Sequence, residues 1–362
     1  MCYTQNRFKA LLSACVLSLI ATAGWSQSLT WLGTLGGGWS EAYGVSADGS
    51  VVVGWARNAA GQWRAFRWTA SGGMQDLGTL GNYESEAFGV SADGAVVVGG
   101  AFNAAWQRRA FRWTASGGMR DLGTLGGNES LAWGVSADGS VVVGGAHNAA
   151  GQWRAFRWTA SGGMRDLGTL GGTWSEAFGV SADGAVVVGG AHNAAGQWRA
   201  FRWQNGVMQN LGTLGGGRSC AYGVSADGAV VVGESDGRAF RWTASGGMME
   251  DLGTLGGDES AAYGVSADGS VVVGESVDRA FRWTASRGME DLNTTYASLL
   301  TNGSVLWEAR AISPDGRYIV GGGWNAATGR DEAFLLDTVP EPASLLALGA
   351  GLVGLLRRRG KQ

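Results

Sequence analysis

The hydrophobic and polar positions of this chain form short runs that repeat in a fixed order. A small, polar phrase (residues 40–49, SEAYGVSADG) is followed by a valine run (51–54, VVVG), an aromatic phrase (64–68, RAFRW) and a leucine-containing phrase (74–80, MQDLGTL). Short runs rich in Val, Phe, Trp and Thr, bounded by Gly, Asp or Ser, are typical of β-strands. The pattern therefore predicts four strands per repeat and no sustained helix before residue 340.

Two turn signals separate these phrases. Ser-Ala-Asp-Gly lies between the first and second phrases, and Ser-Gly-Gly lies between the third and fourth. Both tolerate the positive φ that tight turns between antiparallel strands require. The first turn recurs seven times, with its aspartate at Asp48, Asp93, Asp138, Asp183, Asp227, Asp268 and Asp315. Four antiparallel strands in about 45 residues is the period of a propeller blade.

The order of the phrases at the two ends predicts a closed ring. An isolated fourth phrase (28–35, SLTWLGTL) precedes the first full repeat, and the last repeat has its first three phrases (307–316, 318–322 and 332–336) but no fourth. A β-solenoid of the same repeats is the alternative, but its open ends would need capping repeats. We therefore predict an all-β, seven-bladed β-propeller of four-stranded blades, closed by residues 28–35 joining the last blade.

The charge pattern predicts how the third and fourth strands pair. A hairpin centred on Ser71-Gly72 places Arg67 opposite Asp76, and opposite charges across a strand pair are mutually stabilising. In the last repeat Leu335 replaces this arginine, and in the isolated fourth phrase Trp31 replaces the aspartate. The simultaneous change supports their pairing in one blade. The same alignment predicts the pairs Arg112–Asp121, Arg157–Asp166 and Arg282–Asp291.

Composition fits a folded, turn-rich body. The chain has 65 glycines and three prolines in 362 residues, and the glycines recur at fixed places in the repeat. Residues 24–340 contain 21 Arg, no Lys and 29 Asp plus Glu, a net charge of −8, which argues against a nucleic-acid-binding protein. Cys220 is the only cysteine in this region, so no disulfide can form within it. We interpret Cys220 as a drifted repeat position rather than a catalytic thiol.

The two ends read as export signals. Arg7 and Lys9 precede a mostly apolar run (10–23) that ends in a small-x-small site, so residues 1–26 are predicted to be a secretory signal peptide. At the other end, residues 344–356 form an uncharged stretch that is short for a stable span, which needs about 20 residues. An arginine cluster at 357–359 follows, and such clusters stay on the cytoplasmic side.

The tail, residues 339–362, closely resembles the PEP-CTERM sorting signal. The resemblance rests on the motif Val339, Pro340, Glu341 and Pro342, the short apolar stretch, and the cluster Arg357, Arg358 and Arg359. It implies processing by an exosortase, in a Gram-negative bacterium that makes exopolysaccharide and biofilm matrix. The protein is then expected to be exported, held transiently in the membrane by its tail, and placed outside the cell or on its surface. Signal peptidase and exosortase are the implied partners during export.

The repeats resemble the HAF family of extracellular repeats. The resemblance covers residues 30–336 and rests on LGTLGG, GVSADG, VVVG and RAFRW, although Arg stands in place of the His that gives the family its name. It implies an extracellular location and no particular activity. The domain boundaries predicted are therefore a signal peptide (1–26), a propeller (27–338) and a sorting tail (339–362).

Candidate ligand contacts lie in the loops that vary most between repeats. In a propeller with this strand order the first phrase is innermost, and the loops after the fourth phrase and between the second and third gather at one rim. Variable loops on a rigid scaffold commonly carry binding. The candidates are Trp39, Tyr83, Glu84, Glu129, Trp174, Arg218 and Glu259. The Phe and Trp of RAFRW are expected to fill the core between blades.

No catalytic, cofactor or metal site is predicted. His147 and His192 occupy equivalent places in near-identical repeats, so neither is the single oriented histidine of a catalytic triad. The leading hypothesis is a non-enzymatic, secreted or cell-surface module that binds exopolysaccharide or matrix proteins, or acts there structurally. The alternative is a propeller enzyme acting on polysaccharide through the rim carboxylates Glu84, Glu129 and Glu259.

Overall fold

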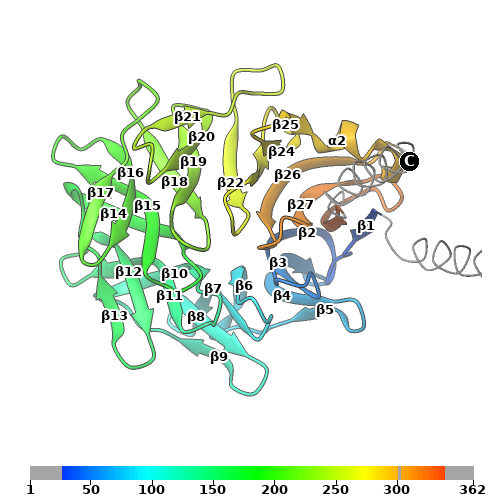
Figure 1. Ribbon diagram of the computed structural model, residues 1–362. Helices are drawn as coiled ribbons and strands as arrows, with labels where there is room; N and C mark the ends of the chain where they lie inside the picture. The colour runs from blue at the N-terminus through cyan, green and yellow to red at the C-terminus, as the bar shows by residue number, and fades with distance from the viewer. Residues whose placement is uncertain (1–26, 301–302, 339–362) are drawn as a thin grey trace, which may run out of the picture. The chain divides into compact units, whose positions relative to one another are not determined.

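The computed structural model describes residues 27–300 and 303–338. The chain divides into a body, Leu29–Asp337, and a second unit made of its two ends, of which only residues 27, 28 and 338 are described. The body consists of seven four-stranded blades arranged around a common centre, and the last and first blades join in one eight-stranded sheet through a parallel bridge between Asp331 and Trp39 (Figure 1). The predicted seven-bladed β-propeller is confirmed. The predicted signal peptide and sorting tail, including Val339, Pro340, Glu341, Pro342 and Arg357 to Arg359, lie outside the described residues.

The strands occupy equivalent places in the seven blades. The innermost strands are β2 (Gly36–Val45), β6 (Gly81–Val90), β10 (Gly126–Val135), β14 (Gly171–Val180), β18 (Ser219–Val224), β22 (Ala261–Val265) and β26 (Val305–Ile312). The second strands are β3 (Val51–Asn58), β7 (Val96–Asn103), β11 (Val141–Asn148), β15 (Val186–Asn193), β19 (Val230–Ser235), β23 (Val271–Glu275) and β27 (Tyr318–Asn325). The third strands are β4 (Trp63–Thr69), β8 (Arg108–Thr114), β12 (Trp153–Thr159), β16 (Trp198–Gln204), β20 (Arg238–Thr243), β24 (Ala280–Thr284) and β28 (Arg330–Asp337). The outermost strands are β5 (Gly73–Asp76), β9 (Gly118–Asp121), β13 (Gly163–Asp166), β17 (Val207–Asn210), β21 (Met249–Asp251), β25 (Gly288–Asp291) and β1 (Ser28–Trp31).

The N-terminal strand completes the last blade. β1 pairs with β28, the third strand of that blade, so the blade order is β26, β27, β28 and β1. The amide of Leu32 donates to the Ala333 carbonyl at 2.9 Å, as the amide of Leu77 donates to Ala65 at 2.9 Å inside the first blade. Closure by the N-terminal segment is therefore confirmed, with the first and last strands of the body, β1 and β28, meeting in one sheet (Figure 1).

The predicted pairing of the third and fourth strands was wrong by one residue. Arg67 lies opposite Gln75, and Phe66 lies opposite Asp76. The reason is the turn: Thr69 pairs with Gly73, so three residues rather than two form the loop, and Gly73 takes a φ of +63°. The equivalent predictions fail in the same way, because Arg112 faces Arg120, Arg157 faces Arg165 and Arg282 faces Glu290.

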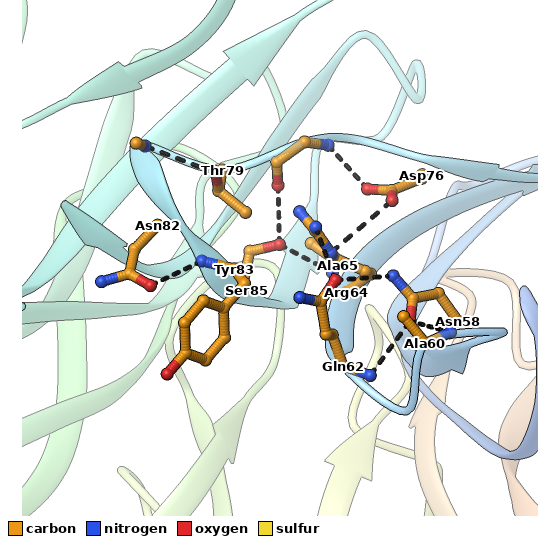
Figure 2. Close-up of polar contacts among 12 residues, drawn as sticks. Asn58, Ala60, Gln62, Arg64, Ala65, Asp76, Thr79, Asn82, Tyr83 and Ser85 are labelled. Atoms are coloured by element: carbon orange, nitrogen blue, oxygen red, sulfur yellow. Dashed lines mark hydrogen bonds and ion pairs between the residues drawn. The ribbon is translucent and has the colours of Figure 1, made fainter. Parts of the chain in front are cut away.

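The aspartate of the fourth strand has a different role. Asp76 accepts a hydrogen bond from the amide of Gly78 at 2.8 Å, and it forms an ion pair with Arg64 at 3.8 Å (Figure 2). In the last blade, Trp31 stands where Asp76 would be, and its ring contacts Phe334 rather than the predicted Leu335. Glu332 stands where Arg64 would be. The two charged partners are therefore lost together, although the pair differs from the predicted one.

One short helical segment departs from the repeat. Helix α2 (Leu292–Thr295) and the 3₁₀ turn η1 (Ala297–Leu299) follow β25, where other blades have Leu-Gly-Thr-Leu. Asp291 caps α2 by accepting from the amide of Asn293 at 2.7 Å. The Asn293 side chain then bonds to both backbone groups of Leu306, which ties the segment to β26. Among the described residues, no helix has the length and apolar character needed to cross a membrane.

The core lies between adjacent blades. Seven clusters of buried side chains fill these junctions, and the Phe of each third strand is fully buried. The cluster that closes the ring joins Val320 and Ala333 of the last blade to Leu32, Val52 and Phe66. The Trp residues of RAFRW also pack here, as predicted, with Trp242 and Trp283 buried and the other four half-buried.

A buried serine joins each of six pairs of neighbouring blades. The Ser85 hydroxyl accepts from the amide of Ala65 at 3.0 Å and donates to the Gly78 carbonyl at 2.7 Å (Figure 2). Ser40 does the same across the ring closure, with Ala333 at 2.9 Å and Gly33 at 2.6 Å. The serines that share this role are Ser40, Ser85, Ser130, Ser175, Ser219 and Ser260.

Candidate functional site

One end of the body carries both the variable loops and the starts of the innermost strands. Gly36, at the start of β2, pairs with Asn58, at the end of β3, and the same pairing recurs in the next three blades. The residues just before each junction serine therefore lie beside the loops between the second and third strands. We call this end the rim. It is the surface at which the candidate contacts were predicted to gather.

The rim loops of the first four blades are held by asparagine. The Asn58 side chain accepts from the amides of Ala60 and Gln62, each at 3.0 Å, and donates to the Gln62 side chain (Figure 2). Asn103 makes the same bonds to Ala105 and Gln107. Side-chain oxygens that satisfy two loop amides fix the loop without support from a core. Side chains on these loops are therefore presented on a rigid base.

The rim groups aromatic side chains into clusters. The Tyr83 ring lies 5.0 Å from that of Trp106, and the Trp174 ring lies 6.1 Å from that of Trp153. Tyr83, Trp106 and Trp174 are 41%, 61% and 41% exposed. The predicted Trp39 instead packs against two further tryptophans and is half-buried. Those two partners are Trp55 and Trp63, and like Trp153 and Trp106 they are rim aromatics that were not predicted as candidate contacts.

Trp106 adopts a backbone conformation normally left to glycine. Its φ is +60°, and the equivalent residue of the other three long loops is a glycine, namely Gly61, Gly151 and Gly196, each with φ above +70°. A non-glycine residue in this region costs about 1–2 kcal/mol. The ring is largely exposed, so burial does not offset that cost. A tryptophan in place of the repeat's glycine was the sequence signal for this residue.

The charged candidates are spread over several blades. Glu84 and Glu129 lie at the fourth position of the equivalent strands β6 and β10, and Glu129 lies 3.9 Å from His147. Arg218 is exposed, and its backbone amide donates to Asp236 at 3.0 Å. Glu259 lines an acidic pocket of about 490 Å³, which also contains Glu234, Asp258, Glu275 and Asp278. Among the described residues, no group of three or more His, Cys, Asp or Glu side chains is arranged to hold a metal ion.

Cys220 is the second residue of β18 and lies opposite Glu234 of β19. It is 3% exposed, and burial raises the pKa of its thiol to about 12. A thiol in this state is unreactive at neutral pH because the thiolate is the nucleophile. This is consistent with the interpretation of Cys220 as a drifted repeat position.

The centre of the ring holds a second candidate site. A cavity of about 520 Å³ is lined by the innermost strands of all seven blades. One aromatic residue from each of six blades faces it, and adjacent ring centroids lie 4.3–5.6 Å apart. In the seventh blade, the guanidinium of Arg310 lies 4.4 Å from the Tyr263 ring and 5.2 Å from the Tyr43 ring. We call this closed set the girdle: Tyr43, Phe88, Trp133, Phe178, Tyr222, Tyr263 and Arg310.

Polar atoms of the girdle bond to half-buried carboxylates. The Trp133 indole donates to Glu176 at 2.7 Å, and the Tyr263 hydroxyl donates to Glu275 at 2.6 Å. Burial raises the pKa of Glu176 and also that of the Tyr263 hydroxyl. The tyrosine therefore stays a neutral donor at physiological pH. These bonds fix the ring orientations and leave the carbon faces and edges to line the cavity.

Arg310 is held by two carboxylates from neighbouring blades. Its Nε donates to Glu41 at 3.1 Å, and its Nη2 lies 2.6 Å from Glu308. Burial, with the adjoining Glu41 carboxylate, raises the pKa of Glu308 to about 9. Glu308 therefore holds its proton to a higher pH than an exposed glutamate does. The sequence signal for the girdle was the aromatic residue that precedes Gly-Val in six repeats, with Arg310 as the exception.

Comparison with known proteins identifies the tail and gives two structural likenesses. Residues 338–360 match the PEP-CTERM protein-sorting motif. No curated protein matches the chain. TolB from Acinetobacter baumannii is similar at 13% identity and a TM-score of 0.48, over 81% of this chain and 64% of that one. A putative TolB from Agrobacterium tumefaciens is similar at 14% identity and a TM-score of 0.46, over 82% of this chain and 90% of that one.

The match to the tail supports part of the prediction made from the sequence. The motif indicates an exported protein that an exosortase sorts, and the body is a β-propeller. The alignment spans less than two thirds of the A. baumannii protein, and at this level of similarity neither TolB structure bears on what the propeller binds.

Proposed function

We propose that this exported propeller is a non-catalytic module of the extracellular matrix that binds exopolysaccharide through the aromatic clusters of its rim. The observation that carries the proposal is Trp106. It occupies a glycine-type backbone conformation at an energetic cost and exposes 61% of its surface beside Tyr83. Strain held at an exposed aromatic residue on a rigid loop is common at binding sites.

The other exposed aromatics favour the same surface. Within the described residues, the large aromatic side chains that are exposed are Tyr83, Trp106, Trp174 and Trp324. The first three lie in the rim clusters, and Trp324 ends β27 beside the corresponding loop of the last blade. An aromatic ring with an apolar face and a solvent-exposed edge suits a sugar ring, because the apolar face can pack on the C–H face of the sugar while the hydroxyls stay in water.

Charge favours a neutral polymer over an acidic one. The body carries 29 acidic residues against 21 arginines, and the rim of the fifth and sixth blades adds an acidic pocket with Glu234, Glu259 and Glu275. A polymer of like charge would be repelled at low ionic strength. Neutral stretches of polysaccharide are therefore the expected ligand of the aromatic clusters.

The same proposal covers the route of export and the final location of the protein. The repeats resemble HAF-type extracellular repeats, and the tail matches a sorting motif. We infer release by signal peptidase, a transient stay in the membrane through the tail, processing by exosortase, and residence in the matrix or on the surface of a Gram-negative cell.

Polysaccharide hydrolysis is the competing proposal. Of the predicted rim carboxylates, Glu259 shares a pocket with other carboxylates, as acid–base cleavage of a glycosidic bond requires. The test is to incubate the purified protein with neutral and acidic exopolysaccharides and to measure both retention and release of reducing ends. Retention without turnover supports binding. Turnover that disappears in Glu259→Gln, with retention intact, would replace the binding proposal with the enzyme.

A further inference from the structure

The girdle cavity is open to solvent and has the size of a small-molecule site. Its volume of about 520 Å³ lies within the range of about 300–1,000 Å³ typical of ligand pockets. Its wall is built from the innermost strands, whose positions are set by the junction serines and the inter-blade core. The wall is therefore preformed, and a ligand would not have to order it.

The wall combines aromatic surface with one cationic donor. The hydroxyls of Tyr222 and Tyr263 are bonded to Glu234 and Glu275, so the rings of the girdle line the cavity mainly with carbon. Arg310 stands alone in the seventh place and stacks against Tyr43 and Tyr263. The near-identical repeats thus give a cavity that is asymmetric at a single point.

Arg310 places a guanidinium in the wall of the cavity. A guanidinium has five N–H groups. The bonds to Glu41 and Glu308 engage Nε and Nη2, and Arg310 is also a lining residue of the cavity. A guanidinium suits the oxygens of a polyol, and the adjoining aromatic rings suit its C–H face.

We propose that the girdle cavity binds a single neutral sugar ring, end-on, as a site separate from the rim. An anionic sugar is disfavoured because Glu41 already balances Arg310 and Glu308 lies 2.6 Å from the guanidinium. An ammonium group is disfavoured because it would approach the guanidinium itself. A neutral ring has no such conflict. The lining of this site shares no residue with the Tyr83–Trp106 and Trp174–Trp153 clusters of the rim, and it touches the third rim cluster where the Tyr43 ring lies 6.2 Å from that of Trp55.

The test uses the full chain with small probes that cannot bridge the rim. Methyl glycosides of glucose, galactose, mannose, glucuronate and glucosamine are titrated by saturation-transfer NMR. At least one neutral glycoside is expected to bind at least tenfold more tightly than the glucuronate and glucosamine probes.

Two variants locate the binding. Arg310→Lys keeps a charge for Glu41 but loses the planar fork, and Phe178→Ala removes stacking surface without touching a charged group. Each is expected to weaken the neutral probe at least tenfold. Met248→Ala, on the exposed outer edge of a blade, is the control and should bind as the parent does.

Three outcomes would overturn this proposal. They are the absence of saturation transfer from every neutral glycoside, equal or tighter binding of a charged probe, and binding by Phe178→Ala at the affinity of the parent. Trp106→Gly separates the two proposals, because it should weaken retention on polymer and leave the methyl glycoside affinity unchanged. If Arg310→Lys does not fold, Phe178→Ala alone decides.

Discussion

Removal of one serine hydroxyl tests how the ring is closed. Ser40 lies at the junction of the last and first blades, 1% exposed, where it joins Ala333 to Gly33. Ser130 makes the same two bonds to Ala110 and Gly123 at an internal junction, at 2.9 and 2.6 Å. Ser40→Ala and Ser130→Ala therefore remove the same chemistry from a closing and an internal junction.

The structure gives the size of the expected effect. Each substitution leaves one buried amide and one carbonyl without their partner, at a cost of about 1–3 kcal/mol per group. We expect each variant to lose roughly 2–5 kcal/mol of unfolding free energy, with the two values within about 1 kcal/mol of each other. Denaturant titration measures the loss. Hydrogen exchange of the Leu32 amide, which is bonded to Ala333, should also accelerate in Ser40→Ala but not in Ser130→Ala. A stable Ser40→Ala variant beside a destabilised Ser130→Ala would show that the N-terminal strand does not close the ring in solution.

Three further predictions follow from single side chains. Because the pKa of Glu308 is raised, its contribution to the unfolding free energy should be full below about pH 4.5 and should fall as pH rises toward 9, by at most about 1.4 kcal/mol per pH unit. The melting temperature of Glu308→Gln should therefore depend less on pH over this range than that of the parent. An equal dependence in the two proteins would contradict this prediction. The unfolding free energy of Asp166→Asn should lie within about 0.5 kcal/mol of the parent value, since Asn210 makes the same turn contact in the next blade. Asp166→Ala should lose about 1 kcal/mol of unfolding free energy, and equal stability of the two variants would refute this prediction. Cys220 should not react with a thiol reagent until the protein unfolds. Cys220→Ser measures the labelling that comes from the two N-terminal cysteines. Stoichiometric labelling of Cys220 in the folded protein would contradict its burial.

The fold was predictable because the same four-strand pattern recurs in seven repeats. The order of the phrases in the repeat predicted which strand is innermost. The isolated phrase around Trp31 predicted the closing strand, because counting the strands at the two ends of the repeat region requires no knowledge of their geometry. The pairing of Arg67 was wrong because a three-residue and a two-residue turn share the Ser-Gly-Gly signal. That difference depends on the φ of Gly73, which sequence alone does not specify.

The candidate site was predictable only in part. The rim was identified from loop variation, and Tyr83 and Trp174 are exposed there. Trp106 was missed because its importance lies in a backbone angle. The girdle was missed because an aromatic residue repeated in every blade is usually core. Its position became clear only when the innermost strands placed Arg310 in the same ring.

The affinity of Trp106→Gly for exopolysaccharide tests the central claim most directly. Glycine is the residue that the protein itself uses at the three equivalent loops, so the variant should fold without loss of stability. Affinity electrophoresis through gels of neutral exopolysaccharides, with melting temperature measured in parallel, gives both quantities. The account predicts at least tenfold weaker binding at an unchanged or higher melting temperature. Binding equal to that of the parent would contradict the rim as the site of polysaccharide binding.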